Sequence, residues 1–233
     1  GGAPRSARCL RDCGATGRWA ALDVRSGALA GARRGKGCGK GDRLALVLQN
    51  IPQFIVATVA SWKLGTIVVP INPMYREREL NEVLSDSGAI GVICLESTLD
   101  MVRTASQGTA VRTTITTSPL EFQTRNDPRI FPSTERAPVG DAMDLMELIA
   151  KHRGSQPDDI HLITDALAPL PYTSGTTGPP KGSMNSHDNV VFNTQLHRDC
   201  GGVGDGVALV PVAPCSHPPG PTGPIAHRSP PAN

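Results

Sequence analysis

The sequence has few aromatic residues, little net charge and no apolar run long enough to cross a membrane. Phe, Trp and Tyr make up 3% of its 233 residues, against 39% for all hydrophobic types, so a core has to be built mainly from aliphatic side chains. The net charge of +2 is too close to neutral to favour nucleic acid or an anionic membrane surface as a partner. The longest apolar stretch, residues 54–71, is interrupted by Lys63, Gly65 and Pro70, and we therefore predict no transmembrane segment.

The cysteines also lack the spacing of a metal site. No two of the six form a C-x-x-C pair, and no nearby histidines complete a zinc pattern. Cys215 and His217 stand close together, but two ligands are too few for a metal ion. We interpret all six cysteines as free thiols in a reducing compartment and predict a cytoplasmic protein without a bound metal of its own. They are Cys9, Cys13, Cys38, Cys94, Cys200 and Cys215.

The stretch PYTSGTTGPPKG, residues 171–182, carries the most distinctive chemistry of the chain. Its glycines leave room for a ligand to approach the backbone, because they lack a Cβ atom, and convergent backbone N–H groups form a nest for an anion. Hydroxyl groups add donors, and a lysine adds a full positive charge. The pattern predicts a polyphosphate-binding loop. The residues that supply these groups are Thr173, Ser174, Gly175, Thr176, Thr177, Gly178 and Lys181.

The flanks of this loop favour the same interpretation. An apolar segment, residues 166–172, predicts a strand, and residues 187–197 predict a helix, whose N-terminus would add partial positive charge to the site. We expect His187, at the helix start, to be structural. A Walker loop is excluded, since Lys181 follows Pro180 and precedes Gly182. The alternative is a surface loop that is rich in Gly, Ser and Thr and binds nothing.

Upstream of the loop, apolar β-rich segments alternate with helical patterns. Residues 44–48, 66–71, 89–95 and 111–117 predict strands, and residues 50–65 and 77–87 predict helices. Asn50 is the expected cap of the first helix and Gly65 its stop. The alternation predicts an α/β fold with a mostly parallel sheet, flanking helices and right-handed crossovers. A dinucleotide-binding fold shares the alternation, but its G-x-G-x-x-G turn is missing at residues 49–52.

Composition divides the chain into three segments. Residues 1–43 contain ten Lys or Arg and three acidic residues, and we treat residues 1–41 as a basic, poorly defined N-terminal segment. An Arg-rich, acid-poor start is also typical of a targeting peptide, although serine is scarce here. Residues 42–210 are the expected nucleotide-binding part, with a proline-rich loop at 119–140 and a helix at 142–152. Residues 211–233 include eight prolines, which predicts a disordered tail.

The loop and its surroundings resemble the adenylate-forming enzymes, which include acyl-CoA synthetases, aryl-CoA ligases, luciferases and the adenylation domains of peptide synthetases. PYTSGTTGPPKG is similar to the phosphate-loop signature specific to that superfamily. Three further stretches resemble bacterial-type long-chain fatty-acid-CoA ligases, and the resemblance runs from about residue 17 to about residue 214. These stretches are GDRLALVLQNIPQFIVATVASWKLGTIVVPINPMYREREL, TTSPLEFQTRNDPRIF and KGSMNSHDNVVFN.

The resemblance implies a chemistry. Such enzymes join a carboxylic acid to ATP and Mg²⁺ as acyl-AMP, release pyrophosphate, and then transfer the acyl group to a thiol, usually that of coenzyme A. The seven loop residues named above would hold the β- and γ-phosphates of ATP. His217 would stand near the acyl-site histidine of the family, although its neighbours differ. The implied substrate is a fatty acid, and the implied fold is a partial N-terminal domain of the adenylate-forming fold.

Several parts of the family pattern have no counterpart in these 233 residues. They are the glutamate segment that binds magnesium, the aspartate that binds the ribose, and the mobile C-terminal domain with the catalytic lysine. We therefore expect a truncated, inactive fragment, with a degraded or mis-framed N-terminus and a frameshift after Pro214. A non-catalytic nucleotide- or phosphate-binding module and a partly unfolded translation product are alternatives. Within the enzyme class, an aryl-CoA ligase or a peptide-synthetase adenylation-domain fragment is the alternative.

Overall fold

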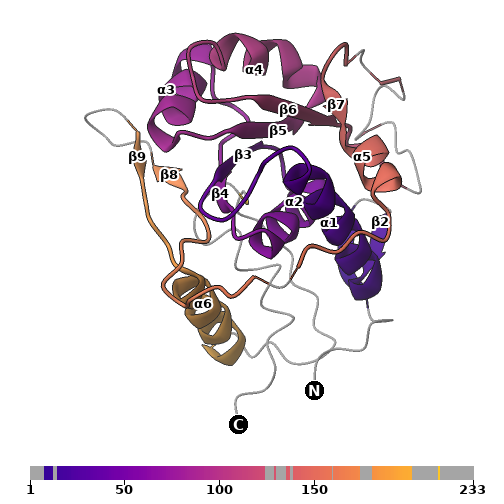
Figure 1. The fold of residues 1–233 in the computed structure, drawn as a ribbon, viewed down its shortest axis with the longest axis vertical. Coiled ribbons are helices and arrows are strands. Elements are labelled where there is room, and N and C mark those ends of the chain that lie inside the picture. Colours follow the sequence, from indigo (N-terminus) through magenta and orange to yellow (C-terminus); the bar gives the residue numbers. More distant parts are fainter. Residues whose placement is uncertain are drawn as a thin grey trace.

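The computed structural model describes residues 8–12, 15–123, 129, 135–136, 139–158, 160–173, 180–200 and 215. Its centre is a five-stranded sheet with the order β4-β3-β5-β6-β7, in which every neighbouring pair is parallel. The predicted α/β fold with a mostly parallel sheet is confirmed (Figure 1). The strands are β3 Arg43–Val47, β4 Ile67–Pro70, β5 Gly91–Leu95, β6 Thr113–Thr117 and β7 Met143–Asp144.

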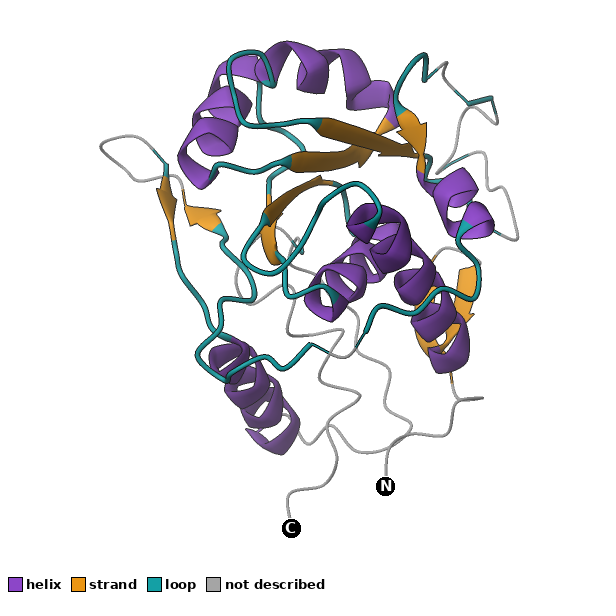
Figure 2. Ribbon diagram, viewed as in Figure 1, coloured by secondary structure: helices purple, strands orange, loops and turns teal. Residues whose placement is uncertain are grey.

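Helices cover both faces of this sheet (Figure 2). Leu44 and Leu46 of β3 point into a core shared with the first group of helices, whereas Ala45 and Val47 point into a core shared with the second. Because side chains alternate between the faces of a strand, a strand buried on both faces reads as one continuous apolar run. The first group is α1 Trp19–Arg34, α2 Pro52–Lys63 and α5 Leu145–Lys151; the second is α3 Glu77–Ser87 and α4 Leu99–Ala105, which follows the short 3₁₀ helix η1 Glu96–Thr98.

Helix α1 lies inside the segment that composition marks as basic. Leu22 and Leu29 are buried in the same core as residues of α2 and α5. The short antiparallel strands β1 Arg8–Asp12 and β2 Ala15–Arg18 precede it. The domain boundaries at residues 41 and 210 stay predictions, and the packing of α1 favours placing the first boundary before residue 19.

Two expected helix starts are wrong. Asn50 does not cap α2: the capping position is Ile51, which makes no side-chain cap bond, and Pro52 opens the helix, where its missing N–H costs nothing. The expected helix at 142–152 begins three residues late, because Met143 and Asp144 pair with β6. Asp144 then caps α5 by accepting a hydrogen bond of 2.9 Å from the backbone N–H of Glu147.

Other helix ends are as predicted. Helix α3 has the expected bounds, and Gly65 follows α2 with a φ of 64°, a conformation that glycine adopts without strain. None of the helices in the described part of the chain is both long and apolar enough to span a membrane.

Candidate functional site

The predicted phosphate loop is the tip of an antiparallel hairpin. Its arms are β8 Tyr172–Thr173 and β9 Lys181–Gly182, and the register places Thr173 opposite Lys181 and Tyr172 opposite Gly182. Further from the tip, the backbone N–H of Ser183 donates to the Pro171 carbonyl at 2.8 Å. A bridge between Leu167 and Ser186 marks the base. The hairpin therefore comprises residues 167–186.

The first arm of this hairpin extends the central sheet. Pro169 forms a parallel bridge with Val68 of β4, and two backbone bonds flank it: Val68 N–H donates to the Ala168 carbonyl at 2.9 Å, and Leu170 N–H donates to the Val68 carbonyl at 2.7 Å. Because the arm runs parallel to β4, its last residue, Thr173, lies toward the carboxyl end of the sheet. Ligands of open α/β sheets bind at this end.

The structure brings two of the predicted site residues together. Thr173 and Lys181 are both exposed and face each other across the two arms where these enter the loop. Ser174, Gly175, Thr176, Thr177 and Gly178 lie outside the described residues, as does the tentative acyl-site residue His217. The geometry at the base of the loop places a hydroxyl and a cation on either side of a segment rich in glycine.

Two residues beside the loop escaped the sequence analysis. The buried Tyr172 donates a hydrogen bond from its hydroxyl to Oδ2 of Asp86 on α3, and burial together with that carboxylate raises the pKa of Tyr172. Gly182 packs closely on this tyrosine, because a Cβ atom there would lie only 3.2 Å from the Tyr172 Cζ. In the sequence, Tyr172 is marked only by its place at the end of an apolar segment, and no pattern marks Asp86 as a site residue.

The expected contribution of a helix N-terminus to the phosphate site is wrong. Helix α6 His187–Cys200 starts at the base of the hairpin, whereas the loop is at its tip. Its first N–H groups are already used, since His187 donates to the Ala166 carbonyl at 2.9 Å and Asp188 donates to the Thr164 carbonyl at 3.1 Å. The Ser186 hydroxyl accepts from Asn189 N–H at 3.2 Å, while the Asn189 side chain accepts from Ser186 N–H at 3.1 Å.

His187 packs against a side chain of helix α2. Its ring meets that of Trp62 edge to face, with centroids 5.6 Å apart and planes at 68°. Burial lowers the pKa of His187, so the ring is neutral at pH 7. These contacts agree with the structural role expected for this residue.

A second polar cluster lies at the carboxyl ends of β5, β6 and β7. Arg136 contacts the carboxylates of Glu96 at 3.2 Å, Glu121 at 3.0 Å and Asp144 at 2.6 Å. Burial raises the pKa of Glu121, against the opposing effects of a bond from Thr117 and the charge of Arg136. The Arg136 guanidinium occupies the space between these carboxylates. Among the described residues, no cluster of three or more His, Cys, Asp or Glu side chains is arranged to hold a metal ion.

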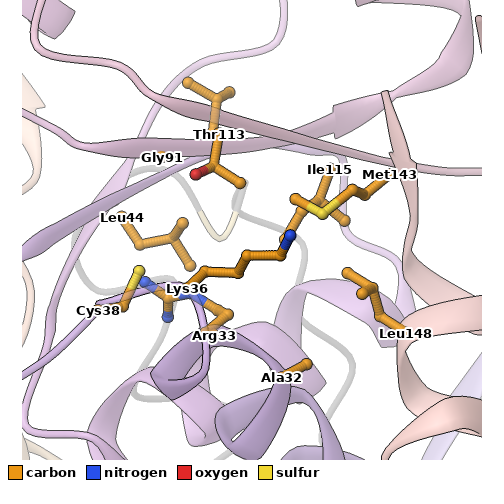
Figure 3. A pocket seen from close by; sticks show the side chains of 11 residues that line it. Ala32, Arg33, Lys36, Cys38, Leu44, Gly91, Thr113, Ile115, Met143 and Leu148 are labelled. Atoms are coloured by element: carbon orange, nitrogen blue, oxygen red, sulfur yellow. The ribbon is translucent and has the colours of Figure 1, made fainter. Parts of the chain in front are cut away.

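One small cavity lies at the opposite, amino-terminal end of the sheet. It has a volume of about 10 Å³, room for roughly one water molecule, and Figure 3 shows Leu44, Ile115 and Met143 around it. Arg33 lines it too, and its buried guanidinium donates to the hydroxyls of Ser61 and Thr66 at 3.2 and 3.4 Å. The cavity is too small for a nucleotide or an acyl chain.

Comparisons with known proteins agree with the fold. The sequence model of a family described as AMP-binding enzyme matches residues 3–224. A long-chain-fatty-acid–CoA ligase of Yersinia pestis is 32% identical over 190 residues, which cover 75% of this chain and 33% of that protein. A medium-chain fatty-acid–CoA ligase of Escherichia coli is 30% identical over 184 residues, which cover 79% and 31%. The chain thus spans about a third of the length of these relatives.

Solved structures share the fold. A long-chain-fatty-acid-CoA ligase of Archaeoglobus fulgidus superposes with a TM-score of 0.74 at 22% identity, over 91% of this chain and 38% of that one. The ATP-bound structure of MatB from Rhodopseudomonas palustris has a TM-score of 0.74 at 24% identity, over 91% and 39%. The predicted resemblance to adenylate-forming enzymes is therefore confirmed. With a family match over most of its length, a parallel sheet of the same architecture and the glycine-rich hairpin at the sheet's carboxyl end, the chain belongs to the family of AMP-binding enzymes.

Proposed function

We propose that this chain supplies the ATP-phosphate site of an AMP-forming acyl-CoA synthetase that acts on fatty acids. The observation that carries the proposal is the pairing of Thr173 with Lys181 at the base of the glycine-rich loop. The names of the two relatives described above, a long-chain and a medium-chain fatty-acid–CoA ligase, support a fatty acid as the substrate. Since the chain spans about a third of those proteins, the activity of the whole enzyme is part of the proposal.

The loop would act on the leaving group. In the first step a carboxylate oxygen attacks the α-phosphorus of ATP, the bond to the bridging oxygen breaks, and pyrophosphate leaves. Lys181 would offset the negative charge that grows on the β-phosphate, and Thr173 would donate a hydrogen bond to it. Ser174, Gly175, Thr176, Thr177 and Gly178 would close the nest around the β- and γ-phosphates through their hydroxyl and backbone N–H groups.

The proposed reaction also requires Mg²⁺, coenzyme A and a site for the acyl chain. Mg²⁺ would accompany ATP and neutralise its phosphates, and in the second step the thiol of coenzyme A would displace AMP from the acyl-adenylate. His217 is the proposed acyl-site residue. We also propose a cytoplasmic location, which the free thiols of Cys9, Cys38, Cys94, Cys200 and Cys215 support.

The test is acid-dependent exchange between ATP and pyrophosphate by the 233-residue chain, over a panel of fatty and aromatic acids. If the 233 residues suffice for adenylation, exchange rises above the blank without acid, is highest with a fatty acid, and falls at least tenfold in Lys181→Ala. Lys151→Ala, which removes an exposed lysine on α5, is the matched control. Exchange that is equal in both variants would contradict the role of Lys181.

A non-catalytic phosphate-binding module is the second candidate, favoured by the fact that the hairpin is formed within this chain. Calorimetry with Mg-ATP separates it from the enzyme. Binding that Lys181→Ala weakens, without any exchange, would favour the module. Absence of both binding and exchange, from a chain that unfolds cooperatively, would refute both candidates for these 233 residues.

A further inference from the structure

We propose that Asp86 is a positioning residue for the polyphosphate loop and acts through the hydroxyl group of Tyr172. The inference rests on the proposed function, since it concerns the same loop. Tyr172 directly precedes Thr173, and it pairs with Gly182, which directly follows Lys181. A contact that holds Tyr172 therefore holds both points at which the hairpin enters the loop.

The Tyr172 side chain joins the hairpin to the α3 face of the sheet. It is 4% exposed and belongs to the core that includes Leu80 and Leu84 of α3. Its hydroxyl donates to Oδ2 of Asp86. Figure 1 shows β8 and β9 on the side of the sheet where α3 lies. The tyrosine is thus fixed at its ring by apolar packing and at its tip by a charge-assisted hydrogen bond.

The second arm of the hairpin packs directly on this ring. A Cβ atom on Gly182 would lie 3.2 Å from Cζ and 3.3 Å from the hydroxyl oxygen of Tyr172, and 3.1 Å from Cδ1 of Leu170. A side chain at this position would require Tyr172 or Leu170 to move by a few tenths of an ångström. A rotation of the tyrosine ring would consequently shift Gly182, and with it Lys181.

The position of Asp86 is unfavourable for α3 itself. It lies in the last turn of a helix that has no basic residue in that turn, where the partial negative charge of the helix end disfavours a carboxylate. Arg43 satisfies the final carbonyls, with donors 2.8 Å from the Ser87 oxygen and 3.0 Å from the Gly88 oxygen. Within the described residues Asp86 makes no ion pair. The carboxylate does not stabilise the end of α3, and its hydrogen bond to Tyr172 is the interaction that explains its presence there.

The experiment compares Asp86→Ala, Asp86→Asn and Tyr172→Phe with the unsubstituted chain of 233 residues. Calorimetry with Mg-tripolyphosphate probes the loop. We expect Asp86→Ala and Tyr172→Phe to bind tripolyphosphate about three- to tenfold more weakly than the unsubstituted chain. Asp86→Asn should lose less, since its amide oxygen still accepts a hydrogen bond. Glu77→Gln, at the exposed start of α3, is the control for charge.

A merely structural role would give a different result. Both Asp86→Ala and Tyr172→Phe lose a hydrogen bond and should unfold at a lower temperature. Binding is therefore measured at a temperature at which every variant is fully folded. If tripolyphosphate affinity is unchanged in the folded variants, their lost hydrogen bond is merely structural and the positioning role is contradicted. Lys181→Ala tests the proposed function separately: if it binds tripolyphosphate as tightly as the unsubstituted chain, the loop is not a phosphate site. If Lys181→Ala weakens binding and neither Asp86→Ala nor Tyr172→Phe does, the inference about Asp86 is overturned.

A second measurement needs no ligand. Amide hydrogen exchange at Ser183, whose N–H donates to the Pro171 carbonyl, should be about three- to tenfold faster in Tyr172→Phe and Asp86→Ala, while exchange at Leu80 of α3 stays the same. Unchanged exchange at Ser183 would refute the inference even in a chain that binds no phosphate.

Discussion

The central sheet and the hairpin of residues 167–186 are held by different contacts. Strand β3 is buried on both faces by aliphatic side chains, with Leu44, Leu46 and Val47 at most 1% exposed. The hairpin instead is joined to β4 by two backbone bonds to Val68, and to α3 by the packed ring and the hydroxyl of Tyr172. Helix α6, which follows the hairpin, leaves Phe192 63% exposed. The side chains that stabilise the fold and those of the candidate site therefore lie in separate parts of the molecule. Substitutions in the sheet should change the unfolding free energy, and substitutions in the hairpin should change ligand binding.

The largest effect should come from the sheet. Leu46→Ala removes a fully buried side chain from β3 and leaves a cavity, so we expect the free energy of unfolding to fall by about 2–5 kcal/mol. Urea denaturation measures it. Val24→Ala, on the exposed side of α1, should change the same quantity by no more than about 0.5 kcal/mol. A small loss in Leu46→Ala would show that the sheet is not the source of stability.

The carboxylate cluster at the end of the sheet should give the next largest loss. Arg136→Met leaves Glu96, Glu121 and Asp144, whose side chains are 6–8% exposed, without this guanidinium. Arg136 is itself partly exposed, so we expect a loss of about 1–3 kcal/mol at pH 7. The loss should shrink at pH 5, because burial raises the pKa of Glu121 and this carboxylate is then the first to take up a proton. Denaturation at both pH values checks this, with the exposed Arg78→Met as control; an equal loss at both would contradict it.

A change at the base of the hairpin should act only locally. Ser186→Ala removes the hydroxyl that caps α6, which costs about 1 kcal/mol. We expect faster amide exchange within α6 and unchanged exchange in β3 and β5. Ser183→Ala, at an exposed position on the same arm, serves as the control. Faster exchange throughout the sheet would show that the two regions unfold together.

The smallest effect concerns pH. Since the pKa of Glu121 is raised in the folded chain, the native state binds a proton more readily than the unfolded state, and its ionisation destabilises the fold as pH rises through the raised pKa. Glu121→Gln should therefore be as stable as the original chain at pH 7, or slightly more so. As pH falls toward 4.5, the ordinary pKa of a glutamate, the unfolding free energy of the original chain should rise relative to that of the variant. A difference in unfolding free energy that is constant with pH would refute this.

Much of the fold follows from local patterns. The bounds of α3 were predictable because its apolar residues recur at helical spacing and Gly88 stops it in a left-handed conformation. Where pairing partners mattered, prediction failed: Met143 and Asp144 have a helical pattern on their own, but the open edge of β6 takes them as a strand. Asn50 likewise has the right chemistry for a cap, yet the chain turns into α2 one residue later.

The sequence by itself determined the aliphatic strands β3 to β6, their alternation with helices that predicts a mostly parallel sheet, and the glycine- and hydroxyl-rich loop with Lys181, because these depend on the chemistry of neighbouring residues. Only the tertiary structure decided that the loop is a hairpin on the edge of β4, that α6 starts at the far end of that hairpin, and that Tyr172 reaches Asp86. These contacts join residues far apart in the chain, 86 positions in the last case. Such pairs form only when the packing of both faces of the sheet has brought their elements together.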